Sequence, residues 1–154
     1  MRCLTLLLGA VLLLCGPAAA ENEFRQLATV TATSGTAEFW EGTFGGTRVV
    51  ILKVKEAGKD GEVNVTFDKK QLLVLSEEVD RLLADGRAMK PGAVVVSSTI
   101  PLGEGSVDLA LVKPGKETLR VLVVKDGKSE RSFVLDRANR APFKRAVEQG
   151  LKSL

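Results

Sequence analysis

The chain has 154 residues and a nearly balanced charge, because 22 Lys and Arg stand against 19 Asp and Glu for a formal net charge of +3. A balance this close to neutral argues against nucleic acid or anionic lipid as the main partner. The sequence contains no His and no Tyr, and its two cysteines are Cys3 and Cys15. The usual catalytic triads and zinc sites depend on His or Cys, so this composition argues against both.

The segment 1–20 has the pattern of a secretory signal peptide. Arg2 supplies a short positive segment, an apolar run of 11 residues extends from Leu4 to Leu14, and small residues then lead to Ala20. This run is too short to cross a bilayer as a helix. We expect cleavage after Ala20 and export to the periplasm or the extracellular space, with no transmembrane segment in the mature chain. The alternatives are a retained anchor and a lipoprotein signal at Cys15, although Leu14 is larger than the residue that usually precedes such a cysteine.

Cleavage would leave the segment 21–154 as a single mature domain, which is long enough to bury a core. Both cysteines would leave with the leader, so packing alone would have to stabilise the domain. Loss of Arg2 would reduce the basic residues from 22 to 21 against 19 acidic ones, a net charge of +2. The mature chain would then lack the side chains for thiol, His-dependent or zinc chemistry. We therefore expect no enzymatic activity, catalytic residue, metal or cofactor.

Four strands and a helix are predicted in the first half of the mature chain. The pattern predicts a glycine-rich turn and four strands: residues 41–46 for the turn, and residues 27–33, 36–40, 47–55 and 62–67 for the strands. Residues 49–52 are apolar on both faces, as in a central strand that is covered on both sides. In the fourth strand the odd-numbered residues are apolar and point one way, while the even-numbered residues, among them Asn64 and Thr66, point to a wet face.

The first helix is predicted to begin after Asp68, which can serve as the N-cap with Gln71 in the capping-box position. Its apolar residues recur at helical spacing and define one buried stripe: Leu72, Leu75, Val79 and Leu82. Gly86 is expected to end the helix in the usual C-terminal manner. The acidic residues opposite the stripe are interpreted as a solvated face, with a paired-carboxylate site as the alternative: Glu77, Glu78 and Asp80.

The second half is predicted to repeat this order of elements. Its strands are expected at four places: residues 93–100, 107–111, 118–125 and 130–135. Asp126 and Gly127 form a strong hairpin signal between the last two. The final helix is expected to start with Asn139 as its cap, since Pro142 suits a first turn. Its apolar stripe has five members: Phe143, Ala146, Val147, Leu151 and Leu154.

The two halves also match in sequence. The segment Arg48–Lys53 is echoed by Arg120–Lys125. The following strand and helix align when Asp68 is placed on Asp136, with a slightly longer first turn in the first half. The match therefore covers the third strand, the fourth strand and the helix of each half.

We therefore predict an α+β fold made of two β-β-β-β-α repeats, about residues 24–86 and about residues 93–154. Each repeat alone would leave a sheet face and a helix stripe in water, and a pair of repeats can bury both. The repeats are expected to form an intramolecular pseudo-twofold pair. The alternative is an eight-stranded β-sandwich or barrel with two helices.

This arrangement resembles PUR-repeat and Whirly-type proteins. The segments that carry the resemblance are Glu62–Asp68, which leads into Leu72–Leu83, and their echo at Glu130–Leu151. The resemblance implies a duplicated β-β-β-β-α architecture and the binding of single-stranded nucleic acid on a sheet surface. A secretory signal and a near-neutral charge depart from these families, so we expect only the architecture, and no binding residue, to carry over.

The candidate ligand-binding residues are the aromatic and basic side chains of the second and third strands. Phe39 and Trp40 are adjacent, so one should be buried and the other should lie on the outer sheet surface near Phe44. An exposed aromatic ring close to Arg48 or Lys53 could stack on a base, a sugar or a partner's side chain. The predicted binding residues are therefore four: Trp40, Phe44, Arg48 and Lys53.

The sequence favours an exported, non-enzymatic binding or scaffolding module, whose unknown ligand would be an envelope protein or polymer. The alternative is a module that binds single-stranded nucleic acid or another polyanion on its outer sheet face. An enzyme that uses carboxylates alone is the third hypothesis. The pattern leaves open whether the protein is a monomer or a homodimer.

Overall fold

The computed structural model describes residues 23–154 as an α+β fold with two four-stranded antiparallel sheets and two helices. The first sheet has the strand order β1-β2-β3-β4 and is followed by a helix: β1 (Phe24–Ala32), β2 (Gly35–Phe44), β3 (Thr47–Glu56), β4 (Val63–Phe67) and α1 (Lys69–Ala84). The second sheet has the order β5-β6-β7-β8 and its own helix: β5 (Val94–Leu102), β6 (Gly105–Val112), β7 (Leu119–Lys125), β8 (Glu130–Val134) and α2 (Arg140–Ser153). The predicted order of elements is confirmed, and the predicted signal peptide, residues 1–20, lies outside the described residues. In the described part of the chain no helix is long and apolar enough to cross a membrane.

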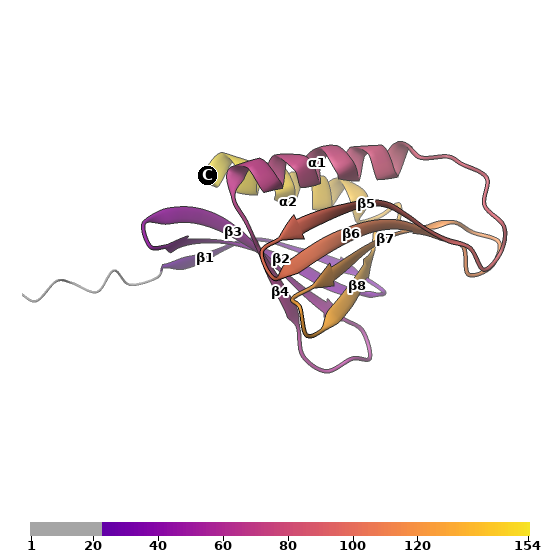
Figure 1. Cartoon of the computed structure of the whole chain (residues 1–154), viewed down its shortest axis with the longest axis horizontal. Helices are drawn as coiled ribbons and strands as arrows, with labels where there is room; N and C mark the ends of the chain where they lie inside the picture. The colour runs from indigo at the N-terminus through magenta and orange to yellow at the C-terminus, as the bar shows by residue number, and fades with distance from the viewer. Residues whose placement is uncertain (1–22) are drawn as a thin grey trace, which may run out of the picture.

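Each helix packs mainly against the sheet of the other half. Helix α1 lies against β5 and β6, whereas α2 lies against β1 and β2, and the two helices contact each other. Figure 1 shows both helices side by side, on the same side of the two sheets. One hydrophobic core cluster draws its members from both sheets and both helices. The two halves therefore bury a single shared core.

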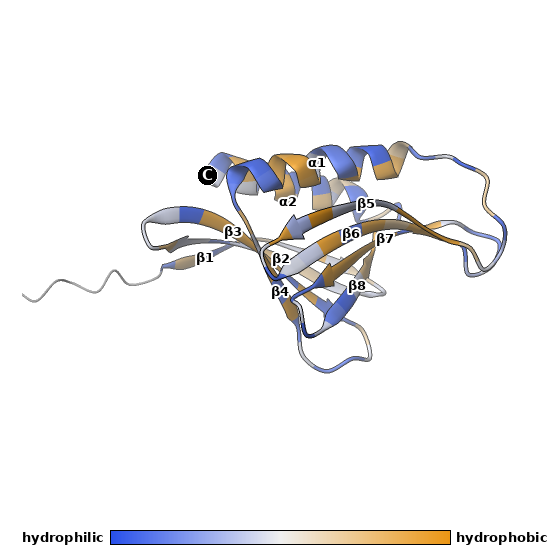
Figure 2. Ribbon diagram, viewed as in Figure 1, coloured by the Kyte–Doolittle hydropathy of each residue, from blue (hydrophilic) through white to orange (hydrophobic). Residues whose placement is uncertain are grey.

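The predicted central strand has the expected burial. In β3, Val50 and Leu52 face the core and are 0% exposed, while Val49 and Ile51 on the opposite face are 8% exposed. Figure 2 shows that the hydrophobic segments run along the strands of both sheets. The outer face of the first sheet is therefore also partly apolar, so it has a surface that side chains can shape into a binding site.

The predicted turn at residues 41–46 is wrong in its extent. Strand β2 continues to Phe44, which pairs with Thr47. Only Gly45 and Gly46 form the turn, and both have positive φ angles of 54° and 82°. A two-residue turn with positive φ at both positions fits the twist of a tight hairpin. The longer ladder brings Phe44 beside Phe24 of β1, a strand that begins before the predicted residues 27–33.

The N-terminus of α1 has the predicted capping box. The Asp68 carboxylate accepts a hydrogen bond from the Gln71 backbone N–H at 2.7 Å, and the Gln71 side chain accepts one from the Asp68 N–H at 3.0 Å. The predicted stripe is buried in full: Leu72, Leu75, Val79 and Leu82. The local sequence therefore fixes both the start and the orientation of this helix.

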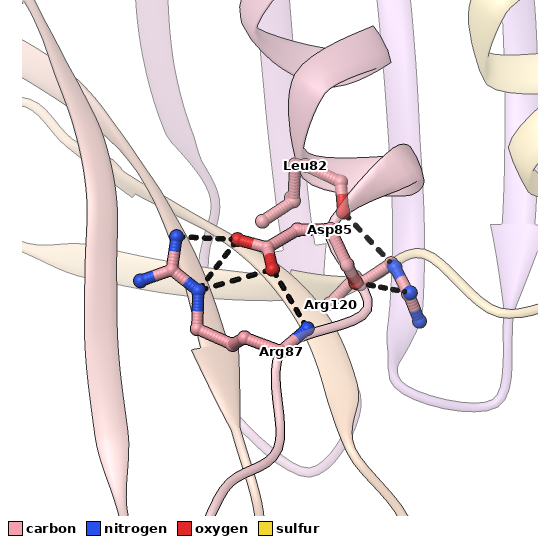
Figure 3. Close-up of polar contacts among 4 residues, drawn as sticks. All are labelled: Leu82, Asp85, Arg87 and Arg120. Carbon is pink, nitrogen blue, oxygen red and sulfur yellow. Dashed lines mark hydrogen bonds and ion pairs between the residues drawn. The ribbon is translucent and has the colours of Figure 1, made fainter.

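The C-terminus of α1 does not end as predicted. The helix stops at Ala84, Asp85 is extended, and Gly86 is not among the glycines with positive φ. Arg120 of β7 satisfies the end of the helix instead, because its Nε donates to the Leu82 carbonyl at 3.0 Å and its Nη2 donates to the Asp85 carbonyl at 2.8 Å (Figure 3). A guanidinium at a helix C-terminus supplies donors for carbonyls that have no partner within the helix. The second half thus caps the helix of the first.

Arg87 holds the Asp85 side chain beside this cap. Its Nε donates to the Asp85 carboxylate at 2.8 Å, as Figure 3 shows. These hydrogen bonds hold the pKa of Asp85 below its usual value. The Asp85 carboxylate therefore binds Arg87, while the Asp85 carbonyl accepts a hydrogen bond from Arg120.

Asn139 takes the predicted N-cap position of α2 but not the predicted role. Its side chain makes no cap hydrogen bond to the helix. It is 2% exposed, its Oδ1 accepts from the Asp136 N–H at 3.0 Å, and its Nδ2 donates to the Val134 carbonyl at 2.9 Å. Asn139 therefore joins the start of α2 to the end of β8, where both polar ends of its buried amide are satisfied.

The free edge of β8 is covered by side chains of the first half. The Ser132 N–H donates to the Glu56 carboxylate at 2.8 Å, and the Val134 N–H donates to the Ser34 hydroxyl at 3.0 Å. Burial alone would raise the pKa of Glu56, but hydrogen bonds from Lys59 and from the Ser132 N–H hold it below its usual value. These contacts satisfy an edge that could otherwise pair with another strand.

The contact of Arg120 with α1 can be tested by substitution. Arg120→Met keeps the apolar stem but removes both donors, which leaves the Asp85 carbonyl without its partner and the Leu82 carbonyl with only the Asp85 N–H at 3.3 Å. We expect the free energy of unfolding to fall by about 1.5–3 kcal/mol, as measured by urea denaturation. Arg137→Met, at an exposed position after β8, is the matched control and should change it by less than about 0.5 kcal/mol. Equal effects of the two substitutions would contradict the capping role.

Gly150 allows a close approach of α2 to the first half. A Cβ atom at this position would lie 3.0 Å from a Leu72 methyl carbon and 3.2 Å and 3.3 Å from the two methyl carbons of Val50. We expect Gly150→Leu to overpack this contact and to destabilise the protein by about 1–3 kcal/mol. Gln149→Leu, at the preceding, exposed position, is the control. Thermal unfolding followed by circular dichroism would measure both, and an unchanged melting temperature for Gly150→Leu would contradict the close packing.

Candidate ligand-binding face

The outer face of the first sheet carries an aromatic groove. Strand alternation buries Phe39, which is 0% exposed, and leaves the adjacent Trp40 half-buried on the other face. This confirms that the two rings face opposite ways. Around Trp40 lies a groove of about 390 Å³. Its lining comes from all four strands of the sheet: Phe24, Trp40, Phe44, Ile51, Lys53, Asn64 and Thr66.

Aromatic contacts shape this groove. Phe24 and Phe44 meet edge to face, with ring centroids 5.4 Å apart and an interplanar angle of 61°. They are 45% and 43% exposed, which is unusual for large apolar side chains. The Lys53 ammonium lies 4.8 Å from the centroid of the Trp40 ring, within range of a cation–π interaction. The groove therefore offers both an exposed aromatic pair and a polarised indole.

The charges beside the groove are already paired. The Trp40 indole N–H donates to the Glu38 carboxylate at 3.0 Å. Glu62 lies 3.8 Å from the Lys53 ammonium and 3.6 Å from that of Lys55. Two carboxylates thus stand beside two lysines, and the outer face carries little net charge. Such a surface suits a neutral ligand better than a polyanion, because each phosphate would meet a carboxylate as well as an ammonium.

Of the four predicted binding residues, the structure brings three together. Trp40, Phe44 and Lys53 line the same groove. Arg48 does not, because strand alternation places it on the same side of β3 as the buried Val50. Its Nη1 donates to the Ser153 carbonyl of α2 at 3.0 Å.

Arg48 lines a second hollow of about 500 Å³, which also includes Arg25, Glu41 and Ser153. Arg25 and Glu41 form an ion pair at 2.6 Å across β1 and β2. The hydrogen bond from Arg25 holds the pKa of Glu41 below its usual value. Each of these charged groups therefore has a partner within the protein, and Arg48 helps to fix the end of α2 against the first sheet.

Sequence reasoning missed four residues of the groove: Phe24, Ile51, Asn64 and Thr66. The alternation of β4 did predict that Asn64 and Thr66 point away from the core, and this orientation is confirmed. The signal for Ile51 was the two-sided apolar run of β3. The position of Phe24 depends on the pairing of β1 with the lengthened β2, which no local pattern reveals.

The remaining candidate motifs belong to ordinary surface features. Among the described residues, no group of three or more His, Cys, Asp or Glu side chains could hold a metal ion. In the acidic cluster of α1, Glu78 pairs with Arg81 and Asp80 pairs with Lys144, each at 2.6 Å. The predicted solvated face is therefore also a site of ion pairing between the two helices.

The sequence matches no protein-family model, and the comparison with curated proteins finds no similar sequence. The resemblance to PUR-repeat and Whirly-type proteins stays a prediction. The function is therefore inferred from the geometry and charge of the groove.

Proposed function

We propose that this protein is an exported, non-enzymatic binding module that holds a neutral sugar chain on the outer face of its first sheet. One observation carries the proposal: three aromatic side chains line a single groove whose neighbouring lysines are already paired with carboxylates. A groove of this kind can bind a ring by contact with its flat face. Its lining residues include no His, Cys or carboxylate, and the Lys53 ammonium is paired with Glu62.

The side chains of the groove suit the chemistry of a sugar. One face of a pyranose ring presents C–H groups, which pack against aromatic rings such as those of Trp40, Phe24 and Phe44. Its rim presents hydroxyl groups, which need hydrogen-bond partners. Asn64 and Thr66 are exposed at the groove and can both donate and accept hydrogen bonds.

Binding of single-stranded nucleic acid is the second candidate. The observation that favours it is the Lys53 ammonium beside the Trp40 ring, because a base could stack on the indole while a lysine contacts a phosphate. Two observations make it weaker than sugar binding. Glu62 lies near both Lys53 and Lys55, and Arg48 is on the opposite face of the sheet.

We also infer that the two halves are related by an approximate internal twofold axis. In support, the strand orders of the two sheets correspond. The first strand of each sheet has a register shift, between Gln26 and Ala28 in β1 and between Val96 and Ser98 in β5. Such bulges are specific features of a strand and rarely coincide by chance.

The ladders give the same correspondence for the next strands. Phe39 pairs with Leu52 in the first sheet, and Leu109 pairs with Leu122 in the second. The same shift in residue number that carries Phe39 to Leu109 also carries Leu52 to Leu122. The pairing partners of β2-β3 therefore correspond in position to those of β6-β7.

The helix contacts agree with this correspondence. The ladders place Leu52 on Leu122, and they therefore place Val50 on Arg120. The sequence match places Arg48 on Arg120 instead, so it does not agree with the ladders. In the helix stripes, where Asp68 is placed on Asp136, Leu82 corresponds to Gly150. Arg120 bonds to the Leu82 carbonyl, and Gly150 packs against Val50, so each helix crosses the other sheet at the corresponding place.

Export can be tested on the protein recovered from the cell envelope or the medium of a producing strain. We expect its mass to correspond to residues 21–154, because cleavage should follow Ala20. Leu8→Arg interrupts the apolar run and should retain the precursor inside the cell, whereas Leu73→Arg at an exposed position of α1 should not. Recovery of the uncleaved chain in the cytosol would contradict this part of the proposal.

Sugar binding can be tested by retention on insoluble chitin, cellulose and peptidoglycan. We expect at least one of them to hold the protein, with little loss as the salt concentration rises, since the contacts are largely uncharged. Trp40→Ala should weaken retention at least about tenfold, as for a central aromatic contact. Trp40→Phe, which keeps a ring, should weaken it less, and Leu73→Ala on the exposed face of α1 is the control.

The same experiment separates the two candidate functions. Retention on a single-stranded oligonucleotide that falls steeply as salt rises would favour the nucleic-acid alternative. Failure of all three polysaccharides to retain the protein would contradict the proposed function. Because Trp40 is the only Trp of the chain, its fluorescence provides an independent readout of binding at the groove.

A further inference from the structure

The free sheet edges of this protein differ in how well they are protected. The edge of β8 is covered by Glu56 and Ser34, and β4 packs against β5 and β7. The other two edge strands are β1 and β5. Within residues 23–154, no hydrogen bond from outside its ladder with β6 reaches the backbone of β5. An edge strand of this kind presents unpaired N–H and C=O groups to any strand of suitable chemistry.

Strand β5 contains no charged side chain along its whole length, VVVSSTIPL. In β1, by contrast, Arg25 and Gln26 immediately precede the bulge, at the places that Val95 and Val96 take in β5. Charged residues on an edge strand are a common device against unwanted pairing. Both strands have a bulge, but β5 lacks the protection of charge.

Two exposed valines make the β5 edge apolar as well as unpaired. Val94 is 63% exposed and Val96 is 54% exposed, more than any other large apolar side chain of the described residues. Each valine ends a row of apolar residues that crosses the outer face of the second sheet. The rows follow the ladders: Val94, Val112 and Leu119 in one, and Val96, Ala110, Val121 and Val134 in the other. Both rows stop abruptly at the β5 edge.

We propose that β5 pairs with β5 of a second copy of this chain, in antiparallel orientation, to form a twofold dimer with a continuous eight-stranded sheet. We infer a second copy as the partner because β5 has no charged side chain. In such a pair a residue at the twofold axis faces its own copy, so a charged side chain there would meet a like charge. With Val96 at the axis, the Val96 row of one copy would continue into that of the other. The bulge between Val96 and Ser98 interrupts the strand and Pro101 has no N–H to donate, so the pairing is confined to the part of β5 around Val96.

The dimer can be tested by sedimentation equilibrium of the purified protein over a range of concentrations. We expect the wild-type protein to dimerise and Val96→Lys to weaken dimerisation at least about tenfold, because two lysines would approach across the twofold axis. Val96→Glu should do the same. A mixture of the two variants should recover the dimer, because lysine then meets glutamate. This recovery distinguishes pairing at β5 from a loss of folding.

Matched controls locate the interface. Thr31→Lys places the same charge on an exposed position of β1, the free edge strand of the first sheet, and should leave the dimer unchanged. Trp40→Ala should also leave it unchanged, so the outcome is independent of sugar binding. A wild-type protein that stays monomeric at every concentration would overturn the proposal. A dimer that survives both single substitutions, or a mixture that does not recover it, would also overturn it.

Discussion

The exchange of helices between the two halves is the constraint on which the rest of the structure depends. Helix α1 covers strands of the second sheet and α2 covers strands of the first, so each half supplies the cover for the other. A specific contact stabilises each of the two places where a helix lies on the opposite sheet. Arg120 bonds to the carbonyl groups that end α1, and Gly150 allows α2 to lie directly on Val50. A core formed in this way brings together segments that are far apart in sequence, so both halves must fold together, with the slow formation of long-range contacts that this implies.

This arrangement decides which surfaces are free for function. The inner faces of both sheets and the apolar stripes of both helices are buried in one core. The outer sheet faces remain, and their side chains are not needed to hold the halves together. On the first sheet these positions carry aromatic residues and paired charges, including Trp40 and Lys53. On the second they carry aliphatic rows that end at Val94 and Val96. The two sheets therefore present outer surfaces of different chemistry.

The features that the sequence predicted are those set by neighbours in the chain. The capping box of Asp68 and Gln71 and the buried stripe of α1 depend on residues within a few positions of one another. The features that it missed depend on distant partners. Gly86 looked like the end of a helix, but Arg120, which lies on a strand of the second half, supplies the donors. Arg48 was predicted to lie on the outer binding face. It is two residues from Val50 on β3, so it lies on the same, core-facing side of the strand.

The groove was only partly predictable for the same reason. Alternation in β2 established that Phe39 and Trp40 face opposite ways, and alternation in β4 placed Asn64 on the outer face. Neither pattern could show that these strands are neighbours of Phe24, because the register of β1 depends on its bulge and on the full length of β2. The charge pairing of Lys53 with Glu62 likewise appears only when β3 and β4 lie side by side. Local patterns therefore predict orientation, whereas the composition of a site requires the register.

The two proposals together suggest why one face would be aromatic and the other aliphatic. A groove for a single sugar chain binds weakly, because a few ring contacts must offset the ordering of a flexible ligand. A polymer, however, offers many equivalent segments. A dimer joined through β5 would carry two Trp40 grooves on one rigid particle, so that binding of one segment would raise the effective concentration of the next. The aliphatic face would then strengthen the function of the aromatic face without contacting the ligand itself.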